Sequence, residues 1–342
     1  MKGYPELFSV EATDRSGDGE LCCEEGHLVT CRRAEVASPA LLGSGQPLVM
    51  AGQTFTFSNR IPPTGFVYKT AEGNEAVISY NEASGNMFGS LKTHDGKSYA
   101  LEKCHLGHVW KEFDVASFGP DESIQRQTIP SIHQTVSHET PAQAPREDDN
   151  TTMVTYSVMF YFTPQFAAAT ADIPGFIDQV IAETNQGYRN SRIPVQVSKL
   201  CIEAATIDDV GEPTTFLHNF EAMKSSAAAL RNTADAAALL AYDFDACGIA
   251  FFYTYTSGHS LSVTQKSCAL GYFSFGHELG HNFGAQHDPD TATNSVFPHG
   301  HGHLIAPLYP GLPGYRSCKR TFAKLSQSRR RPLHTRVSLV DS

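Results

Sequence analysis

The pattern of apolar and polar positions divides the chain into parts with different predicted secondary structure. From Gln53 to about residue 119, short β-prone runs such as EAVISYN and KSYALEKC alternate with turn residues. Asp95-Gly96 is a strong hairpin signal within this part, because both residues tolerate positive φ. The runs predict a small, mostly antiparallel β module over residues 53–119. Residues 1–52 show no sustained period, so we expect a poorly defined N-terminal segment there.

A polar, proline-containing stretch over residues 120–150 separates the β module from the C-terminal half of the chain. It lacks periodic apolar residues, which is typical of a solvated linker. A domain boundary is therefore expected within it.

Residues 151–317 carry the pattern of an α/β domain. A buried strand is predicted at Met153 to Thr163, and apolar residues recur at helical spacing directly after it. The remaining predicted elements are a helix over 173–191, a strand over 194–207, helices over 214–232 and 234–243, and a strand over 247–256. Strands that alternate with helices favour a largely parallel sheet.

Composition and charge narrow the classes of function. The chain has 342 residues, of which 41% are hydrophobic, enough for two domains of ordinary size. No apolar run approaches the roughly 18 residues that a membrane-spanning helix needs, so no membrane span is expected. The net charge of −10 argues against a nucleic-acid partner, because phosphate recognition relies on lysine and arginine. The first residues lack the apolar region of a signal peptide.

The end of the chain differs from its body. From Lys319 onward there are seven basic residues and one acidic residue. Residues 318–342 therefore predict a basic, disordered tail, with a tail that binds acidic surfaces as the alternative.

Eight cysteines suit either a few disulfides in an oxidising compartment or scattered reduced thiols. Cys247 and Cys268 lie on either side of a predicted strand and of the approach to a histidine cluster, so we expect them to pair. Two buried thiols are the alternative.

Three histidines and a glutamate lie within FGHELGHNFGAQHDPD. His277 and His281 are spaced i and i+4, so on a helix both imidazoles project from one face and can bind the same metal ion. Gly284 permits a sharp turn, after which His287 can return as a third ligand. Three nitrogen ligands with an open fourth position are typical of a catalytic zinc site.

Glu278 lies beside the first histidine, within reach of a metal-bound water without being a ligand. One catalytic zinc ion would lower the pKa of that water toward about 7, and Glu278 would accept its proton before attack on a carbonyl carbon. The spacing thus predicts a hydrolase with Glu278 as the catalytic base. A five-residue HExxH pattern often arises by chance, but the extended pattern assigns a role to five positions out of eleven.

HELGHNFGAQHD resembles the zinc signature of the metzincins, and Asn282 and Asp288 resemble its adamalysin or reprolysin branch. The CGIA strand and SVTQKSCALGYFSFGHE, which precede the motif, are similar to the edge strand and the lead into the active-site helix of those peptidases. The resemblance covers about residues 150–317. It implies a metzincin-like catalytic domain, with a twisted mixed sheet and an active-site helix, that hydrolyses internal peptide bonds of proteins or peptides.

The resemblance also implies how a substrate binds. The edge strand near residues 248–256 would hydrogen-bond an extended substrate backbone. Individual substrate-binding side chains and the oligomeric state stay unknown.

The β module, especially MFGSLKTHDGKSYALEKC, is similar to the propeptide that precedes the catalytic domain in this family. This similarity implies a precursor, and the family implies secretion. Cys104 is then a candidate for the open zinc position, although EKCHLGHVWKE does not match the usual cysteine-switch motif. A disulfide or a buried thiol is the alternative for Cys104.

A metzincin also has a tight turn whose methionine packs beneath the zinc ligands. This chain has no methionine after the zinc motif, so the domain is expected to be incomplete after Ser317. That absence favours a rival hypothesis, a zinc-binding but catalytically impaired relative that binds peptides or inhibitors. Three alternating histidines, His299, His301 and His303, are candidates for a second metal, with a solvent-facing segment as the alternative.

Overall fold

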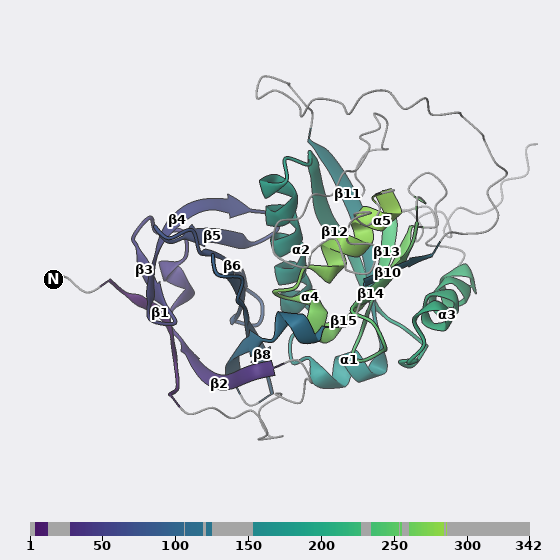
Figure 1. Ribbon diagram of the computed structural model, residues 1–342, viewed down its shortest axis with the longest axis horizontal. Helices are drawn as coiled ribbons and strands as arrows, with labels where there is room; N and C mark the ends of the chain where they lie inside the picture. The colour runs from purple at the N-terminus through teal and green to yellow at the C-terminus, as the bar shows by residue number, and fades with distance from the viewer. Residues whose placement is uncertain are drawn as a thin grey trace, which may run out of the picture.

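The computed structural model describes residues 4–12, 28–105, 107–118, 121–124, 153–226, 234–252, 254, 260–283 and 285. These residues form a mixed α/β structure with two sheets, a closed nine-stranded barrel and a six-stranded sheet covered by helices. Figure 1 shows the barrel, in purple and blue, beside the helix-covered sheet, in teal and green, with helix α2 between them. No helix among the described residues is long and apolar enough to cross a membrane.

The barrel is formed by the N-terminal strands. Its members are β1 (Glu6–Val10), β2 (Leu28–Val36), β3 (Leu48–Met50), β4 (Gln53–Ile61), β5 (Gly65–Lys69), β6 (Glu75–Asn81), β7 (Asn86–Lys92), β8 (Ser98–Cys104) and β9 (Gly107–Phe113). Two short 3₁₀ turns lie at Pro39–Leu41 and Val115–Ser117.

The barrel strands lie in the order β1-β2-β9-β8-β7-β6-β5-β4-β3, and all neighbours are antiparallel except the closing pair β1 and β3. The module is thus larger than the one predicted over residues 53–119, because strands β1, β2 and β3 come from the segment that was expected to be poorly defined. Leu7 and Phe8 of β1 are buried in the barrel core. These strands gain their order from closure with distant partners, which a local pattern does not contain.

The second sheet belongs to the α/β part of the chain. Its elements are β10 (Asp121–Ile124), β11 (Val154–Phe162), α1 (Pro164–Ala169), α2 (Ile173–Asn190), β12 (Val195–Ala204), α3 (Pro213–Ser226), β13 (Ala236–Ala241), β14 (Gly248–Phe251), β15 (Leu261–Gln265), α4 (Lys266–Ala269) and α5 (Ser274–Phe283). The strand order is β10-β14-β15-β13-β11-β12, and every neighbouring pair is parallel except β14 and β15. The prediction of a largely parallel sheet is confirmed.

One predicted helix is a strand. Residues 234–243 were expected to be helical, but Ala236–Ala241 forms β13, the strand between β15 and β11. All six residues of β13 are buried, because helices cover both faces of the sheet. A continuous apolar run in a strand buried on both faces has no alternation that would distinguish it from a buried helix.

Two hydrophobic cores lie on opposite faces of this sheet. On one face, Val158 and Phe160 pack with residues of α2 and α5, including Phe275 and Leu279. On the other face, Met159 packs with residues of α3. Helix α5, which carries the histidine motif, therefore packs on the sheet beside α2.

Strand β10 lies within the segment that was predicted to be a solvated linker. Its four residues pair in parallel with β14, so that Asp121 lies opposite Gly248 and Ile124 lies opposite Phe251. The rest of the predicted linker, residues 125–150, lies outside the described residues.

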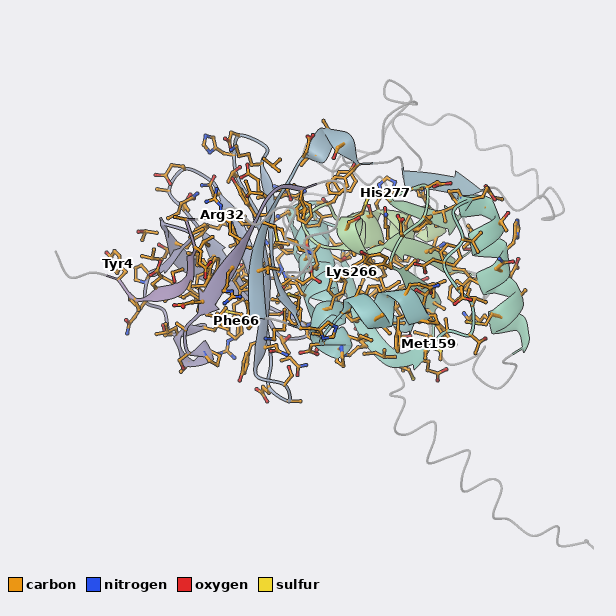
Figure 2. The ribbon with its side chains drawn as sticks, turned by 90° about the horizontal axis from the view of Figure 1, so that it is seen from below. Tyr4, Arg32, Phe66, Met159, Lys266 and His277 are labelled. Carbon is orange, nitrogen blue, oxygen red and sulfur yellow. A yellow bond between two sulfur atoms is a disulfide. The ribbon has the colours of Figure 1, made fainter. Side chains whose placement is uncertain are left out.

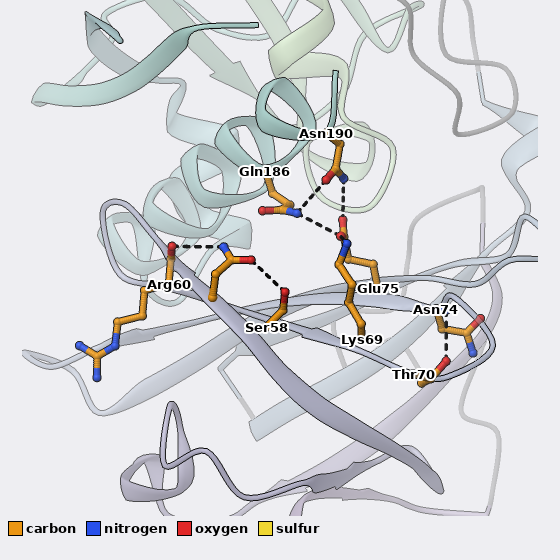
Figure 3. Close-up of polar contacts among 9 residues, drawn as sticks. Ser58, Arg60, Lys69, Thr70, Asn74, Glu75, Gln186 and Asn190 are labelled. Atoms are coloured by element: carbon orange, nitrogen blue, oxygen red, sulfur yellow. Dashed lines mark hydrogen bonds and ion pairs between the residues drawn. The ribbon is translucent and has the colours of Figure 1, made fainter. Parts of the chain in front are cut away.

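The barrel and the α/β part share a polar interface. Asp172 caps the start of helix α2: its side chain accepts a hydrogen bond from Gly175 N at 3.0 Å and another from Asn81 Nδ2 of the barrel at 2.9 Å. At its other end, Gln186 and Asn190 both donate to Glu75 of strand β6, at 3.0 and 2.9 Å (Figure 3). The two parts of the chain are therefore joined along the length of α2.

Buried charges lie at the same interface. Lys266 Nζ of α4 lies 2.5 Å from Glu102 Oε1 of β8. The other carboxylate oxygen of Glu102, Oε2, lies 2.8 Å from Lys111 Nζ of β9. Figure 2 shows Lys266 where the barrel meets the α/β part.

Candidate metal site

The histidine motif forms part of a buried helix. In α5, His277, Glu278 and His281 are 0%, 0% and 1% exposed. Their ligand atoms all lie within 4.8 Å of one another, and the two imidazole centroids are 4.5 Å apart. Figure 2 labels His277 within the α/β part, away from the barrel. The helix therefore brings two of the three predicted histidine ligands and the predicted base into one place.

The end of α5 fixes the orientation of one imidazole. His281 Nδ1 lies 2.8 Å from the carbonyl oxygen of Ala285, so this nitrogen is the donor, and Nε2 is the nitrogen that can bind a metal. Ala285 N in turn donates to Gly280 O at 2.9 Å, just after the last residue of the helix, Phe283. The predicted ligand His287 and the histidines at 299, 301 and 303 lie outside the described residues.

Polar contacts anchor α5 to its neighbours. Asn282 Nδ2 donates to the carbonyl oxygens of Phe251 and Leu261, at 2.7 and 3.2 Å, and so ties the helix to β14 and β15. On another side, Tyr188 of α2 donates its hydroxyl to Gly276 O at 2.8 Å. A helix held by buried hydrogen bonds on two sides keeps its ligands in a fixed arrangement.

The first residue of β14 lies against the predicted base. A Cβ atom on Gly248 would be 2.5 Å from Glu278 Oε1 and 2.7 Å from its Cγ. A side chain at this position would displace the carboxylate, so Gly248 allows β14 to approach Glu278 closely. The sequence did not single out this glycine, because the signal for its role is a contact between distant segments.

A disulfide holds the segment that leads into α5. Cys247 and Cys268, the pair expected from the sequence, are joined, with their Cα atoms 5.4 Å apart. Cys247 directly precedes β14, and Cys268 lies in α4. The bond therefore links the start of β14, the second strand of the sheet, to the approach of the histidine helix.

Buried charges also support this approach. Gly271 N donates to both carboxylate oxygens of Glu183, at 2.9 and 3.1 Å. Burial raises the pKa of Glu183 to about 7, although the Gly271 N–H and the Lys92 charge act against this rise. Burial also lowers the pKa of Lys92 to about 8, while the Glu183 charge acts to raise it.

Cys104 lies in a different environment from the one that a zinc-blocking thiol would need. Its side chain is fully buried in the barrel, in a small cluster with Cys31 and Val109. This burial agrees with the alternative of a buried thiol.

The donor set fits zinc. Two imidazole nitrogens on one turn of a helix are donors of the kind that zinc binds in catalytic sites, and the Glu278 carboxylate lies within 4.8 Å of both, where a base would act on a bound water. Within the part of the chain that the structure describes, these three residues form the group that could hold a metal ion. An α/β sheet with a helix-borne HExxH packed against it defines the class of the zinc metallopeptidases.

Comparison with known proteins places the chain within that class. The family model described as Metallo-peptidase family M12 matches residues 152–321, about half of the chain. This part of the protein belongs to the M12 metallopeptidases and is metzincin-like, as the motif predicted.

Curated relatives extend the likeness beyond the matched family region. The Peptidyl-Asp metalloendopeptidase of Stenotrophomonas maltophilia strain K279a is 29% identical over 267 residues, which are 75% of this chain and 62% of the relative. The protein of the same name from Xanthomonas campestris pv. campestris is 27% identical over 305 residues, 85% of this chain and 69% of the relative. The chain thus spans about two thirds of the length of these relatives.

Among solved structures, metalloproteinase-II from Bacteroides fragilis is similar to this chain with a TM-score of 0.45 and 10% sequence identity. The superposition covers 82% of this chain and 90% of the metalloproteinase-II chain.

Proposed function

We propose that this chain is a zinc-dependent metalloendopeptidase in which His277, His281 and His287 hold one zinc ion and Glu278 is the catalytic base. The observation that carries the proposal is the single turn of α5 that gathers His277, Glu278 and His281, with their ligand atoms within 4.8 Å. The match to the M12 metallopeptidases and the endopeptidase names of the relatives support it.

The residues of the chain have separate roles in this mechanism. Zinc, when bound, supplies a Lewis acid for the scissile carbonyl and an acidified water at neutral pH. Glu278 accepts the proton of the attacking water and delivers it to the leaving amine. The Ala285 carbonyl holds His281 in the tautomer that presents Nε2. Burial of the whole turn limits the access of other water to the reacting groups.

We further propose that the substrate binds as an extended strand at β14. This strand runs beside α5, with Gly248 against Glu278, so a backbone paired with β14 would pass the catalytic carboxylate. The relatives are named for peptidyl-aspartate bonds, and we propose bonds to aspartate as the preferred sites of cleavage. Substrates are proteins or peptides.

The resemblance also suggests a secreted precursor in which the N-terminal barrel serves as the propeptide. The Cys247–Cys268 disulfide supports an oxidising compartment. The barrel precedes the α/β part and packs against α2, which agrees with a module that folds together with the catalytic domain.

The test is cleavage of an unstructured protein by the full chain, with and without a chelator, with the products mapped by mass spectrometry. Glu278→Gln should abolish cleavage and retain one equivalent of zinc, whereas His281→Ala should lose both. Glu82→Gln, an exposed position on the barrel, is the matched control and should behave like the unchanged protein. Products that end or begin at aspartate would support the proposed preference.

The same measurements address the rival hypothesis. One equivalent of bound zinc and measurable peptide binding without cleavage, in the unchanged protein and in Glu278→Gln alike, would support the impaired binding protein. Absence of zinc binding would contradict both hypotheses.

A further inference from the structure

One end of the barrel interior is hollow. A cavity of about 450 Å³ lies there, lined by residues of β1, β2, β7, β8 and β9 and of the turn between β3 and β4. β7, β8, β9, β2 and β1 are successive neighbours around the barrel, and β3 closes it against β1. Figure 2 labels Arg32, which lines the cavity, in the barrel and His277 in the α/β part, so the cavity is separate from the candidate metal site. The open ends of barrels are common sites for small ligands.

The register of the strands directs the lining side chains into the barrel. Tyr99 lies opposite both Leu91 and Glu112, and Leu91 is buried in the barrel core. Residues directly opposite one another in an antiparallel pair point to the same face, so Tyr99 and Glu112 also point inward. Arg32 lies opposite Trp110, whose indole belongs to the same core. The guanidinium of Arg32 therefore shares the inner face of the barrel with the indole.

Aromatic rings form one wall of the cavity. Trp110 and Tyr99 are nearly parallel, with ring centroids 5.4 Å apart and an interplanar angle of 12°. Phe8 packs against the indole with its ring centroid at 4.9 Å. A flat and rigid aromatic surface packs well against an apolar or aromatic group. The wall thus favours a ligand that carries such a group.

Charged side chains lie beside this wall. Arg32 Nε is buried and, among the described residues, has no hydrogen-bond partner. A buried donor without an acceptor costs free energy, and a guanidinium pairs best with a carboxylate, which accepts two parallel hydrogen bonds. Glu112 lies opposite Thr30, two positions along β2 from Arg32, so the Cα atoms of Glu112 and Arg32 are one diagonal step apart, roughly 7–8 Å. The cavity therefore combines a cation that lacks an anion with a carboxylate close to it.

We propose that this cavity binds a short peptide with free termini and an apolar or aromatic side chain. The C-terminal carboxylate of the peptide pairs with Arg32, its ammonium group lies near Glu112, and its side chain packs on Trp110. The two end charges of an extended dipeptide are roughly 6–7 Å apart, which matches the spacing of the two charged residues. A neutral sugar would stack on the indole but would bring no carboxylate to Arg32, so the charges favour the peptide. The site needs neither zinc nor Glu278.

Titration of the dipeptide Leu-Phe into the full chain tests the proposal. The chain carries Glu278→Gln, so the probe stays intact and the result does not depend on the proposed peptidase function. Binding is measured by calorimetry and by the fluorescence of Trp110, which is the single tryptophan of the chain and therefore reports this cavity. We expect saturable binding of one equivalent, with a change in the fluorescence of Trp110.

Leu-Phe amide and acetyl-Leu-Phe test the two ends of the peptide separately. The amide should bind about 10- to 100-fold more weakly than Leu-Phe, because it loses the charge-assisted hydrogen bonds to Arg32. The acetylated peptide should lose less affinity, because Glu112 is also paired with Lys97 at 3.1 Å. These probes use an unchanged barrel, so they test the proposal even if a barrel variant does not fold.

Arg32→Met and Arg33→Met form a matched pair of variants. Arg33 lies opposite Val109, on the outer face of β2, and its Nε is 3.8 Å from Glu11 Oε1. Arg33→Met should bind Leu-Phe like the unchanged barrel. Arg32→Met should bind it about 10- to 100-fold more weakly and should no longer distinguish Leu-Phe from its amide. Urea unfolding shows whether both variants are folded.

Three results would overturn the proposal. The first is the absence of saturable heat and of any fluorescence change at peptide concentrations up to about 1 mM. The second is equal affinity for Leu-Phe and Leu-Phe amide, or equal affinity of the Arg32→Met and Arg33→Met variants for Leu-Phe. The third is binding of maltose as tightly as Leu-Phe, which would indicate a carbohydrate site. None of these results bears on chelator-sensitive cleavage by the chain with Glu278 in place, so the peptidase function is tested separately.

Discussion

The backbone of Gly248 lies directly against the carboxylate of Glu278, so that a Cβ on Gly248 would be 2.5 Å from Oε1 and 2.8 Å from Cδ of the glutamate. Contacts below 3 Å at a Cβ require a shift of one partner. Because β14 is held by its disulfide neighbour Cys247 and by pairing on both sides, the glutamate is the partner that should move.

Gly248→Ala is therefore expected to reduce kcat about 100-fold, since a catalytic base displaced by about 1 Å loses activity on that scale. Zinc content should stay at one equivalent, because no predicted ligand is touched. The measurement is kcat and KM on an aspartate-containing peptide, together with metal analysis. Gly276→Ala is the control, because its Cβ would crowd Thr184 at 3.0 Å on another side of α5. Equal loss of kcat in both variants would contradict a specific role for Gly248.

Several elements could be predicted from the sequence because local signals specify them. Helix α2 was expected over 173–191 and is observed over Ile173–Asn190, since its apolar residues recur at helical spacing and Asp172 caps its start. The HExxH spacing likewise placed His277, Glu278 and His281 on one face of a helix. In both cases the relevant residues are separated by a few positions only.

Other features depend on pairing between distant segments. The contact of Gly248 with Glu278 spans 30 positions, and β10 meets β14 across more than 120, so neither is visible in a local pattern. β13 was mistaken for a helix because alanine and leucine fill a strand buried on both faces. Asn282 was noted only as part of the family signature, whereas the structure shows it joining α5 to two strands.

Asn282 is expected to contribute to stability through its two buried hydrogen bonds. Asn282→Ala would leave the carbonyl oxygens of Phe251 and Leu261 without this donor, at a cost of about 2 kcal/mol in the free energy of unfolding. Asn282→Asp should cost more, because a carboxylate would face two carbonyl oxygens. Urea unfolding of both variants checks the order, with half-buried Asn59→Ala, whose side-chain hydrogen bonds lie at the surface, as a control that should change little. An aspartate variant as stable as the unchanged protein would refute this role.

Glu102 is expected to be critical at the interface between the barrel and the α/β part. It lies between Lys111 at 2.8 Å and Lys266 at 2.5 Å, and the three side chains are 0% to 4% exposed. Glu102→Gln leaves two buried ammonium groups without a carboxylate and should lower the free energy of unfolding by about 3 kcal/mol or more. The comparison is urea unfolding of Glu112→Gln, whose partner Lys97 lies 3.1 Å away and is exposed.

Because the Glu112 pair is near the surface, its loss should cost less than about 1 kcal/mol. The combined variant Lys111→Met, Glu102→Leu and Lys266→Met should recover most of the stability lost in Glu102→Gln, since it removes all three buried charges. If Glu102→Gln and Glu112→Gln lower the free energy of unfolding by similar amounts, the buried group of Glu102, Lys111 and Lys266 contributes no more to stability than a surface ion pair.

Glu183 should make stability depend on pH in the range from about 4.5 to 7. Burial raises the pKa of this carboxyl from its ordinary 4.5 to about 7 in the folded protein. Between these values the folded form holds a proton that the unfolded chain has released, so the free energy of unfolding falls as pH rises, by at most about 1.4 kcal/mol per pH unit. The contribution of Glu183 to the free energy of unfolding is therefore fully present below pH 4.5, and it is lost as the pH rises through about 7.

Glu183→Gln should remove this slope, because glutamine does not ionise and can still accept the hydrogen bond from Gly271 N. His108 changes the free energy of unfolding in the opposite direction. Burial lowers the pKa of His108 to about 4, so its contribution to the free energy of unfolding rises with pH between about 4 and 6.5. The measurement is therefore the difference between Glu183→Gln and the unchanged protein, each unfolded in urea at several pH values from 4.5 to 7.5, in which the His108 contribution cancels. Exposed Glu82→Gln should keep the unchanged slope. If Glu183→Gln also keeps it, the raised pKa of Glu183 is not the source of the pH dependence.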